Sequence, residues 1–103
     1  MSTLIRVGEV SDVSPGTAKL VEARGKRIAL FNLNGQFYAL DNTCTHEGGP
    51  LADGSIQGET VTCPWHGAVF NIKTGAVLYP PAPTDAHSYK VHVEGAEIKI
   101  ELP

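Results

Sequence analysis

Two short cysteine–histidine motifs constrain this chain more than any other feature of its sequence. Cys44 and His46 form a Cys-x-His motif, and Cys63 and His66 form a Cys-x-x-His motif. Sixteen residues separate the two motifs, and glycines lie close to both. Two thiolates and two imidazoles make a four-ligand set for a soft or borderline metal. A metal centre would also help a chain of only 103 residues to hold together.

The distribution of the four residues discriminates between metals. Zinc would accept them tetrahedrally, but zinc modules usually begin with two cysteines about two to four residues apart. Here each motif offers one cysteine and one histidine. That mixture suits two irons, with both cysteines on one iron and both histidines on the other. The pattern favours iron, and a zinc-stabilised interaction module remains the alternative.

Outside these motifs the chain has the periodicity of β-strands. Apolar and polar residues alternate on both sides of short turns, and Asn34-Gly35 is a strong two-residue hairpin signal. We expect each of these strands to have one buried and one solvent-exposed face. The predicted strands are residues 18–23, 26–33, 36–40, 59–62, 69–72, 76–78, 88–93 and 97–102.

Three segments are predicted to be loops. Residues 43–58 contain several glycines, one proline and few β-branched residues, and residues 63–67 contain the second motif. Residues 79–83 contain three prolines, which lack the amide donors that a central strand needs. The pattern predicts an all-β base that carries a loop-rich insert.

Length and charge exclude several function classes. The formal net charge is −3 and the sequence has no basic stripe, so nucleic acid is not an expected partner. No run of apolar residues is long enough to cross a membrane, and no membrane association is expected. The chain has no G-x-G-x-x-G motif and no length for a nucleotide-binding domain. It is therefore not expected to accept hydride itself.

The two motifs and their neighbours, residues 44–51 and 63–68, resemble the Rieske family of [2Fe–2S] proteins. The resemblance implies that Cys44, His46, Cys63 and His66 hold one Rieske-type [2Fe–2S] cluster. It implies an all-β Rieske fold, an antiparallel β-sandwich base with a small loop-rich cluster-binding subdomain. A single domain would span residues 1–103, with the base at 1–42 and 69–103 and the cluster-binding part at 43–68. The loop at 79–83 would cover the cluster.

Four positions depart from the Rieske proteins of respiratory complexes. Gly49 and Trp65 stand where those proteins have two further cysteines, so the disulfide between their cluster loops cannot form here. Ala68 and Phe70 stand where those proteins have a serine and a tyrosine whose hydroxyls bond to sulfur. Fewer donors at sulfur disfavour the reduced cluster, so we expect a potential toward the low end of about −150 to +300 mV.

The low-potential, soluble members that the chain resembles best are ferredoxins of bacterial aromatic-ring-hydroxylating dioxygenase systems. The resemblance implies a one-electron carrier in aromatic hydrocarbon catabolism, and we expect it to be a monomer. The first residues lack the pattern of a signal peptide, so a cytoplasmic location is expected. The carrier would take electrons from a flavin-containing NAD(P)H reductase and pass them to a terminal Rieske oxygenase. The chain would not be an enzyme, because it has no second His/carboxylate set for a mononuclear iron. The alternative is the small Rieske-like subunit of an assimilatory NAD(P)H nitrite reductase.

Charge is unevenly distributed along the chain. No lysine or arginine occurs from Ile28 to Ile72, a stretch with four acidic residues. These acids form either an ordinary solvated surface or an acidic face that docks a basic partner. His87 and His92 lie outside the motifs and are expected at the surface. The four acids are Asp41, Glu47, Asp53 and Glu59.

Overall fold

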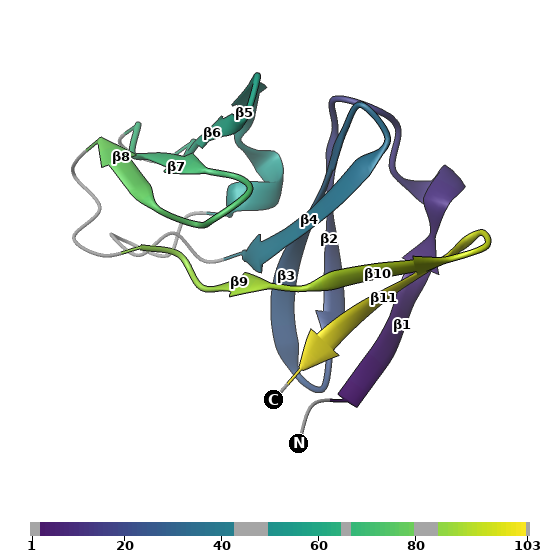
Figure 1. The fold of residues 1–103 in the computed structure, drawn as a ribbon. Helices are drawn as coiled ribbons and strands as arrows, with labels where there is room; N and C mark the ends of the chain where they lie inside the picture. Colours follow the sequence, from purple (N-terminus) through teal and green to yellow (C-terminus); the bar gives the residue numbers. More distant parts are fainter. Residues whose placement is uncertain (1–2, 43–49, 65–66, 80–84, 103) are drawn as a thin grey trace.

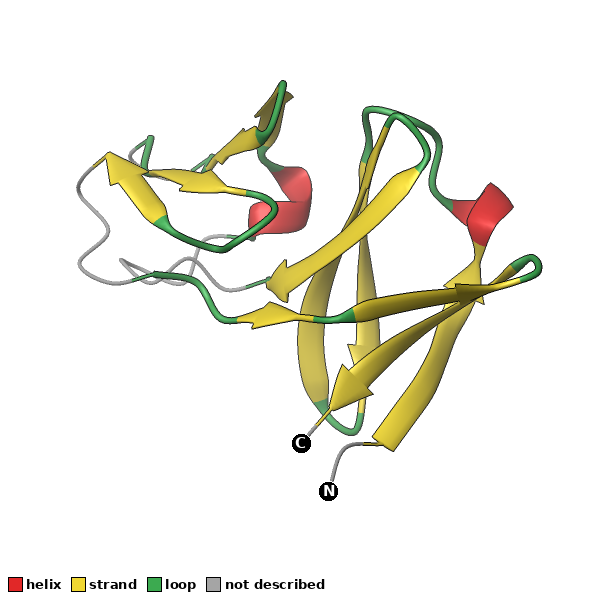
Figure 2. Cartoon of the chain, viewed as in Figure 1, coloured by secondary structure: helices red, strands yellow, loops and turns green. Residues whose placement is uncertain are grey.

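The computed structural model describes residues 3–42, 50–64, 67–79 and 85–102. Nearly all of the regular structure in these ranges is β-strand, together with two short 3-10 helices (Figures 1 and 2). Neither helix is long or apolar enough to cross a membrane. In chain order the elements are β1 (Thr3–Glu9), η1 (Val10–Asp12), β2 (Ala18–Ala23), β3 (Lys26–Leu33), β4 (Gln36–Asp41), η2 (Leu51–Asp53), β5 (Ser55–Gln57), β6 (Thr60–Thr62), β7 (Val69–Asn71), β8 (Val77–Tyr79), β9 (Ser88–Tyr89), β10 (Val91–Glu94) and β11 (Glu97–Leu102).

The strands form three antiparallel sheets. Strands β1, β11 and β10 make the first sheet, and β2, β3, β4 and β9 make the second. A smaller third sheet contains β5, β6, β7 and β8 in that order. Figure 1 shows the second sheet between the other two. These sheets confirm the predicted all-β class with an antiparallel base.

Strand β3 is buried on both faces, because the second sheet packs against a separate apolar core on each side. Ile28 and Leu30 point into one core, and Ala29 and Phe31 point into the other. The expectation of one solvent-exposed face per strand is therefore wrong for β3. The base core consists of Val13, Val21, Ala23, Ile28, Leu30, Phe37, Ala39, Tyr89, Ile98, Ile100 and Leu102. The loop-side core consists of Ala29, Phe31, Leu40, Leu51, Val61, Cys63, Ala68, Phe70, Ile72 and Ala86.

Two tight turns connect the strands of the second sheet. Arg24 and Gly25 have φ of 52° and 78°, and Asn34 and Gly35 have φ of 54° and 91°. Left-handed backbone at both central residues matches the right-handed twist of the strands on either side. The predicted hairpins at both positions are confirmed.

The structure corrects two secondary-structure predictions. Residues 55–57, expected in a loop, form β5 and pair with β6. The glycines at 54 and 58 on either side hid this short strand in the sequence. The predicted strand at 88–93 is interrupted at Lys90, because β9 pairs with β4 whereas β10 pairs with β11. This segment therefore passes from one sheet to another.

Strands β7 and β8 pair with β6 and with each other, within the third sheet. The sequence-based division placed residues 69–79 in the base. The alternating residues of a strand identify its buried face, but they do not identify the sheet that it joins. The third sheet therefore includes residues on both sides of the second cysteine–histidine motif.

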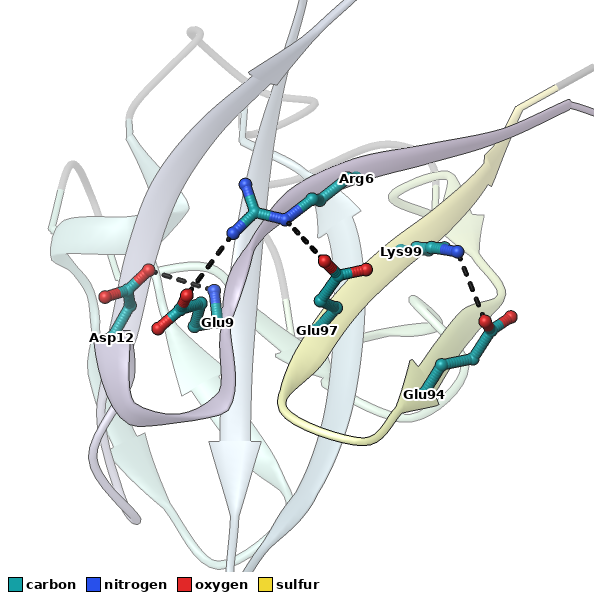
Figure 3. A network of polar contacts seen from close by, with 6 residues as sticks. All are labelled: Arg6, Glu9, Asp12, Glu94, Glu97 and Lys99. Carbon is teal, nitrogen blue, oxygen red and sulfur yellow. Dashed lines mark hydrogen bonds and ion pairs between the residues drawn. The ribbon is translucent and has the colours of Figure 1, made fainter.

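Exposed ion pairs join the first sheet across its surface (Figure 3). The Arg6 side chain lies 3.5 Å from Glu9 and 3.4 Å from Glu97, and Lys99 lies 3.2 Å from Glu94. Pairs this exposed contribute little to stability.

Candidate metal centre

Of the four predicted ligands, Cys63 lies among the described residues, and Cys44, His46 and His66 lie outside them. Elsewhere in the described ranges, no group of three or more metal-ligating side chains is close enough to hold an ion. The predicted site is therefore described through Cys63 and through the residues beside the three predicted loops.

Cys63 directly follows β6 and is only 2% exposed. Its amide donates a 2.7 Å hydrogen bond to the carbonyl of Ala68, which closes the base of the second loop. Gly67 has φ of 75°, a left-handed conformation that glycine adopts without strain. The cysteine is thus held in a closed turn at one end of the third sheet.

Asn42 joins the two ends of the first loop. Its carbonyl accepts a 2.7 Å hydrogen bond from the amide of Leu51, and its side-chain Oδ1 accepts a 2.8 Å bond from the amide of Ala52. Its own amide donates to the carbonyl of Arg27 at 3.0 Å. Asn42 is only 6% exposed, and these bonds satisfy its backbone amide, its carbonyl and its side-chain oxygen.

The third loop is anchored where the chain returns from it. Asp85 Oδ1 accepts a 2.9 Å hydrogen bond from the amide of Val77, and the amide of Ala86 donates to the carbonyl of Gly75 at 2.8 Å. Gly75 has φ of 80° and passes so close to Ala86 that a Cβ there would lie 2.0 Å from its carbonyl oxygen. Only glycine fits this approach without a shift of the backbone.

The residues that flank the three loops pack together. Leu51 begins η2 within the first predicted loop, Cys63 begins the second and Ala68 follows it, and Ala86 follows the third. All four belong to the loop-side core. The fold therefore brings described residues beside all three predicted loops into one core. Asn42 was not among the residues expected from the sequence at this site, although an Asn immediately before a glycine-containing loop is a usual signal for a closing role.

The described acids of the proposed acidic face do not all lie together. The chain turns between β5 and β6 and between β7 and β8 at the end of the third sheet opposite Cys63. Glu59 lies at that opposite end, where it forms an ion pair with Lys73, and both residues line a cleft with Leu33 and Asn34 of the β3–β4 hairpin. Glu59 therefore does not belong to a face at the loops.

Of the other three acids, Asp53 is exposed in η2, beside the first loop. Asp41, at the end of β4, accepts a hydrogen bond from the hydroxyl of Tyr89. Glu47 lies outside the described residues.

Both remaining histidines are exposed, as predicted. His92 Nε2 lies 3.1 Å from a carboxylate oxygen of Glu101 on the first sheet. The ring of His87 meets that of Tyr89 edge-on, with 4.6 Å between the ring centroids. Among the residues that the structure describes, neither histidine lies in a group suited to a metal.

Comparison with known proteins identifies the family. The model of the Rieske [2Fe–2S] domain matches residues 3–90, most of the chain. This chain belongs to the Rieske [2Fe–2S] domain family. Membership implies one Rieske-type [2Fe–2S] cluster, in agreement with the expected cofactor.

Relatives of this Rieske chain are ferredoxins of dioxygenase systems. It is 42% identical to the 3-phenylpropionate/cinnamic acid dioxygenase ferredoxin subunit of Escherichia coli (strain K12), over 91% of this chain and 89% of the relative. The structure of the Sphingomonas yanoikuyae B1 ferredoxin matches with a TM-score of 0.91 and 31% identity, over 98% of this chain and all of that one. A chain from a complex of reduced oxygenase and oxidized ferredoxin in carbazole 1,9a-dioxygenase matches with a TM-score of 0.88 and 33% identity, over 94% of this chain and 91% of that one.

The described residues of the Rieske chain fit such a cluster. Cys63 offers a soft sulfur ligand in apolar surroundings, among side chains that include Val61 and Phe70. Cys63 thus offers one buried thiol in a core shared with described residues beside all three predicted loops.

Ala68 and Phe70 offer a test of how this Rieske chain sets its potential. Both side chains are fully buried in the loop-side core with Cys63. We expect Ala68→Ser combined with Phe70→Tyr to raise the reduction potential, because hydroxyl donors to sulfur favour the reduced, more negative cluster. Protein-film voltammetry measures the shift.

Ala29→Ser, in the same core but on β3, is the control that should leave the potential unchanged. An unchanged or lowered potential in the double variant would show that the hydroxyls do not bond to sulfur.

Proposed function

We propose that this protein is a one-electron carrier whose [2Fe–2S] cluster is bound by Cys44, His46, Cys63 and His66. It would receive electrons from a flavin-containing NAD(P)H reductase and pass them to the terminal Rieske oxygenase of an aromatic-ring-hydroxylating dioxygenase system. The observation that carries the proposal is the complete ligand pattern, together with the buried position of Cys63 at the meeting point of the loop bases. The cluster supplies one reversible oxidation–reduction step.

The named relatives support the choice of partner. The relatives at 42% identity are ferredoxin subunits of a dioxygenase, and one structural relative forms a complex with its oxygenase. Ferredoxin subunits transfer electrons and are not the catalytic components, which agrees with the expectation that this chain is not an enzyme. These names favour the carrier over the small subunit of a nitrite reductase. We also propose that the carrier is a monomer and acts in the cytoplasm, where thiolate ligands stay reduced.

The chain's own residues exclude water from the thiolate and hold the loops. Cys63 is buried in the same apolar core as Leu51, Val61 and Phe70. Lys73 and Glu59 pair at the other end of the sheet, and their hydrogen bond raises the pKa of Lys73, so this lysine stays charged. The Glu59–Lys73 ion pair and Cys63 thus lie at opposite ends of the third sheet.

A direct test of the proposed function follows electron delivery under anaerobic conditions. Reduced protein is mixed with an oxidised Rieske oxygenase from a dioxygenase system of this kind, and the visible spectrum of each partner is followed. The proposal predicts that one equivalent of protein delivers one electron. A reduced protein that transfers no electrons to any such oxygenase, yet reduces a sirohaem-containing nitrite reductase, would contradict it.

Docking is expected to depend on acids beside the loops. Electrostatic steering acts over about a Debye length, about 8 Å at physiological salt. Glu47→Lys should therefore slow the second-order reduction of the protein by its reductase several-fold, and rising salt should reduce the difference. Glu59→Lys, the same exchange at the opposite end of the third sheet, is the control and should have little effect. Stopped-flow rates that respond equally to both variants would show that net charge, and not a local face, governs association.

A further inference from the structure

A short segment after the third loop is hydrogen-bonded to two different sheets. We call residues 85–89 the strap. At its first end, Asp85 and Ala86 bond to the hairpin of β7 and β8, through Val77 and Gly75. These bonds attach the strap to the third sheet, which carries Cys63.

The other end of the strap bonds to the end of β4. The amide of Asp41 donates a 2.9 Å hydrogen bond to the carbonyl of His87. The hydroxyl of Tyr89 donates a 2.6 Å hydrogen bond to Asp41 Oδ1. Asp41 therefore donates one hydrogen bond to the strap and accepts another from it. Cys44, in the first motif, follows only three residues later in the sequence. The strap thus connects the strand before the first motif to the sheet that holds the second.

The Tyr89–Asp41 bond is well placed to fix this connection. Tyr89 is 8% exposed and belongs to the base core, and its ring meets that of His87 in a T-shaped contact. A short bond between a hydroxyl and a carboxylate is among the stronger hydrogen bonds in proteins. Burial of the ring, followed by the bond to Asp41, raises the pKa of the Tyr89 hydroxyl well above its ordinary value, so the group remains a donor.

We propose that Tyr89 is a positioning residue for the cluster: its hydroxyl holds Asp41, and thereby the start of the first cluster loop, in register with the third sheet. The bond sets the relative placement of the ligands in the two motifs without touching the cluster. This inference rests on the proposed ligand set, because it requires ligands in both motifs.

The test compares two tyrosines that differ in their partners. Tyr89→Phe removes only the hydroxyl that bonds to Asp41. Tyr38→Phe is the matched control, since it removes a hydroxyl from β4 that bonds to Gln36 at the surface, at 2.8 Å.

The measurements are the EPR g-values of the reduced cluster and the hydrogen exchange of the Asp41 amide. We expect Tyr89→Phe to shift the g-values and to speed this exchange by about tenfold or more. If Tyr89→Phe and Tyr38→Phe both match the wild type, the proposal is overturned.

A second pair of variants decides the question even if Tyr89→Phe fails to fold. Asp41→Asn keeps an oxygen acceptor for Tyr89 but removes the charge, whereas Asp41→Ala removes both. The proposal requires the asparagine variant to retain wild-type g-values and the alanine variant to shift them. Equal behaviour of the two variants would overturn it. A wild-type protein without histidine nitrogen coupled to its cluster would instead refute the proposed ligand set, so the two failures are distinguishable.

Discussion

Replacing Cys63 by serine is expected to abolish the [2Fe–2S] cluster. Serine keeps the size of the side chain, but its neutral hydroxyl is a much harder and weaker ligand for iron than a thiolate. Cys63 is buried among apolar side chains, and the other described members of this core offer no soft ligand in its place. The purified variant should contain less than about a tenth of the wild-type iron, and its visible absorption should be lost. Iron and acid-labile sulfide analysis after reconstitution in vitro measures the effect.

His92→Ala is the control for this experiment. His92 is exposed on the first sheet and bonds to Glu101, so its removal should leave iron content and spectrum unchanged. A Cys63→Ser protein with full iron and sulfide would show that the cluster is held elsewhere. A His92→Ala protein without a cluster would show that the histidines have been misassigned.

Replacing Gly75 by alanine is expected to destabilise the protein strongly. The new Cβ would lie 2.0 Å from the carbonyl oxygen of Ala86, and Gly75 has φ of 80°. Backbone strain and the loss of the hydrogen bond from Ala86 together cost about 2–4 kcal/mol. In a domain of this size that loss lowers the thermal midpoint by roughly 10 °C or more. Thermal unfolding of the cluster-loaded protein, followed by far-ultraviolet circular dichroism, measures it.

Gly16→Ala separates the close contact from the backbone strain. Gly16 also has φ of 80°, but nothing lies within 4 Å of the position of its Cβ. This variant should lose only the strain contribution, about 1–2 kcal/mol. Equal losses in the two variants would mean that the strap moves freely away from Gly75, and that the approach of Gly75 to Ala86 contributes nothing to stability.

The sequence predicted the elements whose signals are local. The hairpins at Arg24-Gly25 and Asn34-Gly35 were predictable because the turn chemistry at each is determined by two adjacent residues. Strand β11 was predictable because its alternation matches its buried and exposed faces. The two motifs identified the family for the same reason, since their residues and spacing are local and specific.

The features that the sequence did not predict depend on tertiary contacts. Strand β3 is buried on both faces because a third sheet covers it, which its own residues cannot reveal. The break at Lys90 arises because β9 and β10 join different sheets. Glu59 pairs with Lys73, the first basic residue after the stretch without lysine or arginine. Counting charges along that stretch therefore grouped Glu59 with acids that lie elsewhere in the fold.

The roles of Tyr89 and Asn42 have the same origin. Tyr89 reads as an ordinary core residue until its hydroxyl is seen to contact Asp41, a residue distant in the sequence. The closing bonds of Asn42 run to Arg27, Leu51 and Ala52, which lie on both sides of it in the chain. Pairings over such separations follow from the packing of the sheets and not from any local pattern.

We propose that two histidines, His46 and His66, bind the cluster together with Cys44 and Cys63. Pulsed EPR of the reduced protein, grown with ¹⁵N-labelled histidine, tests this ligand set, because strong coupling requires a nitrogen bound to iron. We expect couplings from two histidine nitrogens, both of which persist in His87→Ala and His92→Ala and one of which is lost in His46→Cys. Absence of any strongly coupled histidine nitrogen, or loss of a coupling in His87→Ala or His92→Ala, would contradict it.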